Sequence, residues 1–203
     1  EKDAPHLTPR AVITVDLFGQ PADHDTIVTF AHERGMKVLE DAAQGFGGTE
    51  GGRRAGSLAD AATTSFFPAK PLGCYGDGGA IFTDDAELAQ LLRSLHIHGK
   101  GSNVRVGRNS RLDTIQAAIL RVKLAAFVEM ELEARNDVAV RYSEALADLD
   151  LVTPIVRDGF SSSWAQYTLK TPDRASRDSL QAALKERAIP TAVYYPRPLH
   201  AQP

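Results

Sequence analysis

A lysine between two prolines is the position in this sequence best suited to covalent chemistry. Lys70 lies between Pro68 and Pro71 at the end of an apolar run, which places its amine on a rigid and partly desolvated turn. Burial of an amine lowers its pKa, so the uncharged amine can attack a carbonyl carbon and form a Schiff base. The alternative interpretation of Lys70 is a surface lysine in an ordinary turn.

Two other polar residues follow or end apolar runs in the same half of the chain. Asp41 follows the apolar run that begins at Met36, and Ser65 precedes Lys70 by five residues. A carboxylate on a pyridine nitrogen, with a lysine at the other end of the ring, is the pairing through which proteins use pyridoxal phosphate (PLP) as an electron sink. A serine hydroxyl is an uncharged donor to a phosphate. Taken singly, Asp41 is equally explained as a loop anchor and Ser65 as a strand serine bonded to a neighbour.

A basic stretch follows at residues 95–111, which contain no acidic residue. Arginine binds phosphate through two parallel hydrogen bonds, so a mobile loop at residues 99–107 suits a phosphate-bearing substrate, and a solvated cationic loop is the alternative. His96 and His98 lack a nearby cysteine or carboxylate in the sequence, and we expect no metal site there. The basic residues are Lys100, Arg105, Arg108 and Arg111.

Several other chemistries lack their motifs. The sequence has no phosphate-binding loop of the Gly-x4-Gly-Lys type, no Gly-x-Ser-x-Gly turn and no dinucleotide fingerprint, which disfavours kinases, hydrolases and Rossmann dehydrogenases. The net charge of −3 favours neither nucleic acid nor a membrane surface as the main partner. Cys74 is the single cysteine, a usage typical of a reducing compartment, and we expect a cytoplasmic protein.

The elements that must position these residues alternate between apolar runs and helical stretches, the pattern of an α/β fold with a mostly parallel sheet. The carboxyl ends of such strands bring Asp41 and Lys70 to one edge. Residues 45–56 hold six glycines and are expected to form a loop. We expect buried strands at residues 11–18, 36–40, 61–67 and 78–83, and helices from Asp23 or Asp25 to Arg34 and from Asp84 or Asp85 to about Leu95.

The second half of the chain begins with a helix. Asp113 and Gln116 match a capping box, and the apolar spacing that follows continues to about Leu149, long enough to connect two domains with a bend. A strand at 164–171, a helix at 176–187 and a strand at 191–195 would then open a smaller α+β domain. The predicted division is therefore 1–112, a connecting helix at 113–149, and 150–203.

Five motifs together resemble the DegT/DnrJ/StrS family of PLP-dependent sugar aminotransferases. The resemblance runs from about residue 11 to residue 203, with the motifs in family order. It implies a PLP-dependent transferase fold of type I, with the later part of the large PLP-binding domain at 1–112. The motifs lie at residues 40–44, 64–73, 76–80, 107–113 and 195–200.

Two stretches resemble one group within the family more than the others. Residues 15–23 and 70–79 are most similar to members that aminate the 3-keto position of a UDP-linked 2-acetamido uronic acid for surface polysaccharide, such as lipopolysaccharide O-antigen. The resemblance implies a nucleotide-sugar substrate and an amino-acid donor, with glutamate as the expected donor. Relatives that dehydrate carry histidine at the position of Lys70, so the lysine implies transamination.

The resemblance also implies a role for each matching residue. Lys70 would hold PLP covalently and move a proton to or from the substrate carbon. Asp41 would pair with the pyridine nitrogen, Gln44 would lie against the ring, and Ser65 would bind the phosphate. Asn109 would reach the cofactor phosphate of the neighbouring subunit, which implies a homodimer with a shared active site. The expected substrate contacts are Arg111, Tyr194, Tyr195 and His200.

The family's large domain has an earlier part that is not in this sequence, and its small domain has a later part, so we expect a segment of a longer protein. Two alternatives stay open: a non-catalytic sensor or scaffold that keeps the fold, and a PLP-independent Schiff-base lysine enzyme such as an aldolase. A turnover assay separates the first alternative from an aminotransferase, and cofactor content separates the second.

Overall fold

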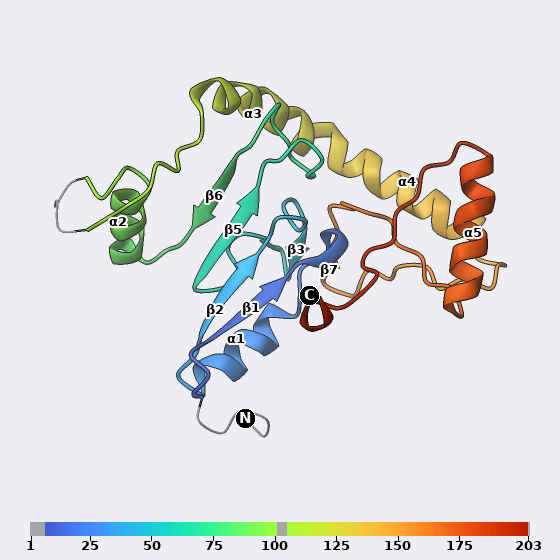
Figure 1. Cartoon of the computed structure of the whole chain (residues 1–203), viewed down its shortest axis with the longest axis horizontal. Coiled ribbons are helices and arrows are strands. Elements are labelled where there is room, and N and C mark those ends of the chain that lie inside the picture. Colours follow the sequence, from blue (N-terminus) through green and yellow to red (C-terminus); the bar gives the residue numbers. More distant parts are fainter. Residues whose placement is uncertain (1–6, 101–104, 203) are drawn as a thin grey trace. The chain divides into compact units, whose positions relative to one another are not determined.

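A four-stranded sheet forms the centre of the computed structural model, which describes residues 7–100 and 105–202 (Figure 1). The strand order is β1-β2-β5-β6. Strands β1 (Ala11–Val15), β2 (Lys37–Asp41) and β5 (Ala61–Ser65) are parallel, and β6 (Gly79–Phe82) is antiparallel to β5. The expected α/β architecture with a mostly parallel sheet is confirmed.

The two faces of this sheet differ in burial. Side chains alternate between faces along a strand, and the pairing register places Thr14, Glu40 and Ala62 on one face, where all three are buried. On the other face Ile13 is 66% exposed and Ile81 is 53% exposed. The expectation of a buried strand at 11–18 is therefore wrong in part, because β1 ends at Val15 and only one of its faces is covered.

Helix α1 (His24–His32) packs on the buried face, where Ala31 and Val38 belong to one hydrophobic cluster (Figure 1). It begins where the Asp23 carboxylate accepts a hydrogen bond from Thr26 N at 3.2 Å, which satisfies one of the free N–H groups of the first turn. Gly35 follows its end with φ 67°, a conformation that glycine adopts without strain. Helix α2 (Ala86–Leu95) is capped in the same way by Asp85.

The long helical stretch consists of α3 (Thr114–Ala126), a π-helical turn at Phe127–Glu131 and α4 (Leu132–Ala145). The π-helical turn interrupts the α-helical hydrogen bonding within this stretch, for which a bend was expected without a stated position. Asp113 caps α3 through Ile115 N at 2.7 Å. The capping box is only half formed among the described residues, because the Gln116 side chain accepts from Tyr75 N at 2.8 Å.

Two strand predictions are wrong. Within the described part of the chain, residues 191–195 form no strand, and residues 164–171 form only an isolated antiparallel bridge between Lys170 and Val152. Trp164 has φ 50°, which is incompatible with an extended strand, and Pro190 and Pro196, which flank the second segment, lack N–H donors. A strand also needs a neighbouring strand for its hydrogen bonds, and sequence periodicity alone does not supply one.

The glycine-rich stretch at 45–56 is not only a loop. It contains β3 (Thr49–Glu50) and β4 (Arg53–Arg54), and β3 pairs with both β4 and β7 (Phe160–Ser161) in a small antiparallel sheet of order β4-β3-β7. Glycine-rich sequence allowed the tight turn between β3 and β4, where Gly51 and Gly52 have φ of 55° and 78°.

The chain divides into two compact units. Unit 1 comprises Glu1–Tyr142 with Ile155–Tyr167, and unit 2 comprises Ser143–Pro154 with Thr168–Pro203. Unit 2 contains α5 (Arg174–Glu186), close to the helix expected at 176–187. The division at residues 112 and 149 stays a prediction about the whole protein. In the described residues, no helix combines the length and the hydropathy needed to cross a bilayer.

Candidate active site

The strand register brings two of the predicted cofactor residues to one face of the sheet. Asp41 ends β2 and pairs with Thr63, and Ser65 lies two residues further along β5. Because side chains two residues apart share a face, Asp41 and Ser65 both lie on the less covered face. One strand spacing and two residue rises separate their Cα atoms by about 8 Å.

Both side chains are held by short local hydrogen bonds. One carboxylate oxygen of Asp41 accepts from Ala43 N at 3.0 Å. The Ser65 hydroxyl oxygen accepts from Phe67 N at 3.2 Å, which leaves its hydrogen available for donation. The alternative interpretations, Asp41 as a loop anchor and Ser65 as a locally bonded serine, therefore correspond to contacts in the structure. These contacts also fix the direction of each side chain.

Gln44 lies three residues beyond Asp41, but its side chain is hydrogen-bonded to the backbone of another segment. Its Oε1 accepts from Phe18 N at 2.7 Å, and its main-chain carbonyl accepts from the Ser163 hydroxyl at 2.9 Å. The first bond ties the segment that carries Asp41 to the turn after β1, and the second ties it to the segment that carries Ser163. In this structure Gln44 acts on that turn, and its predicted contact with the cofactor stays a prediction.

Lys70 lies on the loop between β5 and β6 and is half-buried. The ends of this loop are closed by backbone bonds, from Phe66 N to the carbonyl of Gly78 at 2.8 Å and from Cys74 N to the carbonyl of Phe66 at 2.8 Å. Within the described residues no hydrogen bond or ion pair joins Lys70 Nζ to another group. The amine is thus presented on a fixed loop, as expected from the flanking prolines.

The long helices anchor the same loop from outside. Lys123 of α3 donates to the carbonyl of Gly73, and Arg135 of α4 donates to the carbonyl of Pro71 at 3.2 Å. Gly73 has no room for a side chain, because a Cβ there would lie 2.6 Å from the carbonyl oxygen of Pro68. Helix packing therefore determines where the loop presents Lys70.

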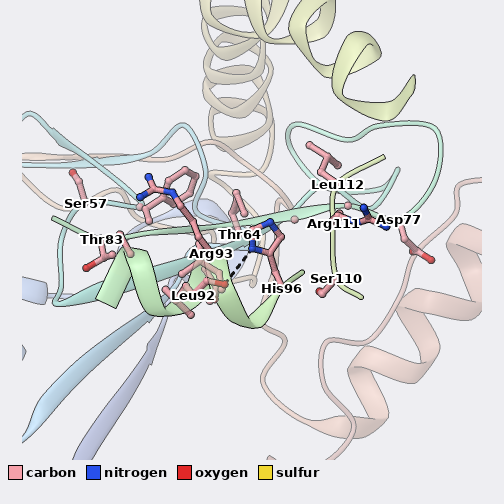
Figure 2. Close-up of a pocket in the computed structure, with 18 of the residues that line it drawn as sticks. Ser57, Thr64, Asp77, Thr83, Leu92, Arg93, His96, Ser110, Arg111 and Leu112 are labelled. Carbon is pink, nitrogen blue, oxygen red and sulfur yellow. Dashed lines mark hydrogen bonds between the residues drawn. The ribbon is translucent and has the colours of Figure 1, made fainter. Parts of the chain in front are cut away.

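Asn109 and Arg111 lie in a cavity that also includes Thr63, the strand partner of Asp41. This cavity of about 1070 Å³ lies between the β5–β6 hairpin and α2, and neither Asp41, Ser65 nor Lys70 lines it. Figure 2 labels Arg111 and Asp77 among the residues that line the cavity. The Asn109 Oδ1 atom accepts from Arg111 Nε at 3.0 Å.

The basic stretch is partly organised by its own backbone. Arg108 N donates to the carbonyl of Leu95 at 2.8 Å, and His98 N donates to the carbonyl of Arg108 at 3.0 Å. His96 Nδ1 lies 3.1 Å from the carbonyl of Leu92, a bond drawn in Figure 2. The loop expected to be mobile at 99–107 lies partly outside the described residues, which omit 101–104.

The remaining predicted substrate residues belong to unit 2. Tyr194 and Tyr195 have their ring centroids 5.5 Å apart in an edge-to-face arrangement, and both rings are about half exposed. His200 is exposed within a short 3-10 turn at Leu199–Ala201. Their roles in substrate binding stay predictions.

A cluster of buried charged residues was missed by the sequence interpretation. Asp16, His24 and Glu40 are fully buried, and His24 Nε2 lies 2.9 Å from Asp16 Oδ1. The sequence offered one signal for this burial. Asp16 and Glu40 each lie two residues after a buried position, Thr14 and Val38, and residues two apart in a strand share a face. The contact of both strands with His24 depends on where α1 begins.

Burial and mutual charge perturb these groups in a definite direction. Burial raises the pKa of Glu40 to about 7, and the Asp16 carboxylate adds to the rise. The hydrogen bonds from the backbone N–H groups of Gly56 and Leu58 act in the opposite direction and lower this pKa. Burial acts to lower the pKa of His24, but its hydrogen bond to Asp16 and the charges of Asp16, Glu40 and Glu50 outweigh burial and raise it. Glu40 is therefore partly protonated near neutral pH.

The donor set on the Asp41 edge suits PLP. A carboxylate can hold a protonated pyridine nitrogen, a hydroxyl can donate to a phosphate, and a primary amine can bond to the aldehyde carbon. Asp41, Ser65 and Lys70 supply these three groups from β2, from β5 and from the loop that follows β5. The residues present therefore fit the group that the sequence predicted.

Comparison with known sequences agrees with this donor set. Residues 4–203 match the family described as the DegT/DnrJ/EryC1/StrS aminotransferase family. The chain is 50% identical over 202 residues to the UDP-2-acetamido-2-deoxy-3-oxo-D-glucuronate aminotransferase of Pseudomonas aeruginosa, covering 97% of this chain and 55% of that protein. It is 47% identical to a "Pleiotropic regulatory protein" of Geobacillus stearothermophilus, covering 96% of this chain and 53% of that protein. The chain thus spans about half the length of the curated relatives it matches.

Solved structures give the same result. An aminotransferase of the family from Brucella abortus has 49% identity and a TM-score of 0.93, over 99% of this chain and 54% of that one. The Bacillus subtilis protein NtdA, solved with its cofactor PMP, has 31% identity and a TM-score of 0.83, over 97% of this chain and 46% of that one. The fold is that of PLP-dependent transferases of type I. Motifs, sheet register and similarity over nearly the whole sequence agree, and the chain belongs to the DegT/DnrJ/EryC1/StrS aminotransferase family.

Proposed function

We propose that the intact protein is a PLP-dependent aminotransferase that moves an amino group from glutamate to a keto sugar nucleotide. The observation that carries this proposal is the placement of Asp41 and Ser65 on one face of the sheet, with Lys70 on the loop that follows Ser65. The substrate we propose is a UDP-linked 3-keto-2-acetamido uronic acid, on the strength of the 50% identity to the Pseudomonas aeruginosa enzyme. The product would serve surface polysaccharide synthesis, including lipopolysaccharide O-antigen.

Each residue of the site has a defined task in this proposal. When bound, PLP supplies an electron sink to the carbon that gains or loses the amino group. Lys70 binds the cofactor covalently and, once released, carries a proton at the substrate carbon. Asp41 holds the pyridine nitrogen, Gln44 lies against the ring and Ser65 donates to the phosphate. Arg111, Tyr194, Tyr195 and His200 orient the nucleotide sugar.

The first experiment tests the cofactor and its lysine together. The intact protein, incubated with PLP, is reduced with borohydride, and its peptides are mapped by mass spectrometry. We expect a pyridoxyl group on Lys70 and none in Lys70→Ala, whereas Lys37→Ala, a substitution of a 78% exposed lysine, keeps the label. A Lys70→Ala protein that keeps the PLP absorption spectrum and normal turnover would disprove the proposal, and a labelled lysine elsewhere would move the site.

We also propose a homodimer whose subunits share each active site, acting in the cytoplasm. The support is the resemblance of Asn109 to the family residue that reaches the neighbouring cofactor phosphate, and the single, buried cysteine suits a reducing compartment. Mixing inactive Lys70→Ala and Asn109→Ala proteins after reversible dissociation tests the shared site. Random pairing restores up to about a quarter of the activity if each site uses both subunits. No recovery from proteins shown to exchange subunits contradicts it.

A second candidate function follows from the relative named a pleiotropic regulatory protein, which is 47% identical. In that case the protein keeps the fold and PLP but acts without turnover. Glutamate-dependent amination of the keto sugar nucleotide favours the aminotransferase, whereas PLP binding without turnover of any keto sugar nucleotide favours a regulator. A covalent substrate adduct on Lys70 without PLP would instead indicate a Schiff-base lysine enzyme such as an aldolase.

A further inference from the structure

The buried cluster of Asp16, His24 and Glu40 lies directly behind the candidate cofactor edge. Glu40 precedes Asp41 in β2, so the two carboxylates point to opposite faces of the sheet. Asp16 follows β1, and its N–H donates to the carbonyl of Asp41 at 3.1 Å. The cluster therefore touches the backbone of the residue that we assign to the pyridine nitrogen.

The turn after β1 holds the whole segment from residue 41 to residue 45. Phe18 N donates to Gln44 Oε1 at 2.7 Å. Asp16 packs so closely on Gly45 that a Cβ at that glycine would lie 2.4 Å from the Asp16 Cβ. Ser163 links the two segments, donating through its hydroxyl to the carbonyl of Gln44 at 2.9 Å and through its N–H to the carbonyl of Gly19 at 2.9 Å. Asp16 thus contacts both ends of the segment, Asp41 and Gly45.

The cluster is held by several hydrogen bonds, while Asp16 Oδ2 and His24 Nδ1 are buried without a hydrogen-bond partner among the described residues. Asp16 Oδ1 accepts from Ala22 N at 3.1 Å and faces His24 Nε2 at 2.9 Å. Glu40 uses both oxygens, accepting from Gly56 N at 2.5 Å and from Leu58 N at 3.0 Å. These bonds fix the three side chains in position.

The charge of the cluster is unbalanced unless it holds an extra proton. Asp16, Glu40 and the buried Glu50 supply three carboxylates, while the facing cations are His24 and Arg53, which lies 3.6 Å from Glu50. Buried charge without a counter-charge is costly, so one carboxyl group retains a proton near neutral pH.

We propose that Asp16, His24 and Glu40 are positioning residues for the cofactor-binding segment 41–44, acting as a buried network that shares protons and holds Asp41 and Gln44 in place. The proposal rests on the proposed function, because Asp41 and Gln44 are cofactor residues only if the protein binds PLP. Deprotonation of the network places two carboxylates against each other behind Asp41 and loosens the segment. PLP affinity then falls as the network loses its proton.

A divalent cation is the rival occupant of this cluster. The three side chains offer donor atoms that all lie within 4.8 Å of one another. Both Glu40 oxygens already accept backbone N–H bonds, and the Asp16–His24 contact has the length of a direct hydrogen bond. The geometry thus favours a hydrogen-bonded cluster over a metal site.

The test compares the PLP dissociation constant at pH 6 and pH 8 in the intact protein. Glu40→Gln keeps the side-chain shape and removes its ionisation, and Glu33→Gln, at an exposed ion pair with Arg34, is the matched control. We expect the ratio of the two constants to be about threefold to tenfold smaller in Glu40→Gln than in the wild type, since half to one unit of linked pKa converts to that ratio. The control keeps the wild-type ratio.

A second measurement needs neither cofactor nor a stable Glu40 variant. In apo protein carrying ¹³C-labelled histidine, the His24 signal is assigned by its loss in His24→Gln. We expect it to titrate above the ordinary imidazole value in the wild type and at a lower pH in Glu40→Gln.

The outcomes separate this proposal from the proposed function. If the wild type fails to bind PLP at Lys70, the function and the positioning role both fall, and the histidine titration still decides whether the network shares protons. If PLP binds but Glu40→Gln shows the wild-type ratio, the positioning role alone is overturned. An ordinary His24 titration, or one equivalent of a divalent metal in the purified protein, overturns the shared-proton network.

Discussion

The two ends of helix α1 carry the same kind of contact in opposite surroundings. At its start, His24 Nε2 lies 2.9 Å from the Asp16 carboxylate, with Glu40 beside them and all three fully buried. At its end, His32 Nε2 lies 2.9 Å from the Asp60 carboxylate, which is 19% exposed and also pairs with Lys37. Burial raises the pKa of Glu40 to about 7, whereas Lys37, His32 and the Val38 N–H together outweigh burial and lower the pKa of Asp60 to about 2.

The difference shows that burial and the number of partners, not the length of the contact, decide what a histidine–carboxylate pair does. At the exposed end, one carboxylate meets a lysine, a histidine and a backbone N–H and stays ionised. At the buried end, carboxylates outnumber cations, and a proton must be shared. The exposed cluster, defined as His32, Asp60 and Lys37, is therefore structural, and the buried one is sensitive to neutral pH.

The largest expected difference between the two clusters is the loss in the free energy of unfolding when the central carboxylate of each, Asp16 or Asp60, is removed. Asp16→Ala leaves the N–H of Ala22 and His24 without their acceptor in the core, and we expect the free energy of unfolding to fall by about 3–5 kcal/mol. Asp60→Ala, the matched change at the exposed end, should cost about 1–2 kcal/mol. Urea unfolding of the intact protein measures both. Equal losses would show that burial does not distinguish the clusters.

The pH dependence of stability should reverse between the two ends. Glu40 has a pKa raised from 4.5 to about 7 on folding, so stability present below pH 4.5 is lost as pH rises to 7, by about 3 kcal/mol. The raised pKa of His24 extends the loss above pH 6.5. Glu40→Gln should flatten the unfolding free energy across this range, apart from about 1 kcal/mol lost at every pH because glutamine has one acceptor oxygen. An unchanged slope in Glu40→Gln would contradict the assignment.

For the exposed cluster, the free energy of unfolding should fall at acidic pH. The pKa of Asp60 is lowered from 3.8 to about 2, so its stabilisation is present above pH 3.8 and is lost as pH falls towards 2, by about 2 kcal/mol. Asp60→Asn should remove that part of the acid sensitivity, seen as a shallower dependence of the urea midpoint on pH between 4 and 2. Asp84→Asn, which changes an exposed carboxylate, is the control and should leave the dependence as it is.

The smallest effect should come from Lys37→Ala. Lys37 is 78% exposed, and exposed ion pairs contribute little because water and salt screen them. We expect thermal unfolding at pH 7 within error of the wild type and a slight rise in the pH of acid unfolding, since Asp60 loses one of its partners. A large loss of stability at pH 7 would mean that the exposed cluster behaves like the buried one.

Much of the candidate site was predictable because its signals are local. Asp41 follows an apolar run, Lys70 lies between prolines, and Asp23, Asp85 and Asp113 cap the helices that follow them. Each of these signals involves residues within a few positions of one another, where backbone preferences and capping bonds act. The predictions of strands at 164–171 and 191–195 were wrong because hydrophobic periodicity does not specify which other segment a strand pairs with.

Sequence alone determined that Glu40 and Asp41 point to opposite faces, since successive strand residues alternate. It did not determine which carboxylate would be buried, nor that His24 and Asp16 would meet Glu40 across 16 and 24 positions of chain. Those facts depend on the parallel register of β1 and β2 and on α1 covering one face, which are long-range contacts. The tertiary structure therefore made one carboxylate a proton-sharing group and left its neighbour on the open face for a ligand, because burial sets the free energy of each charge.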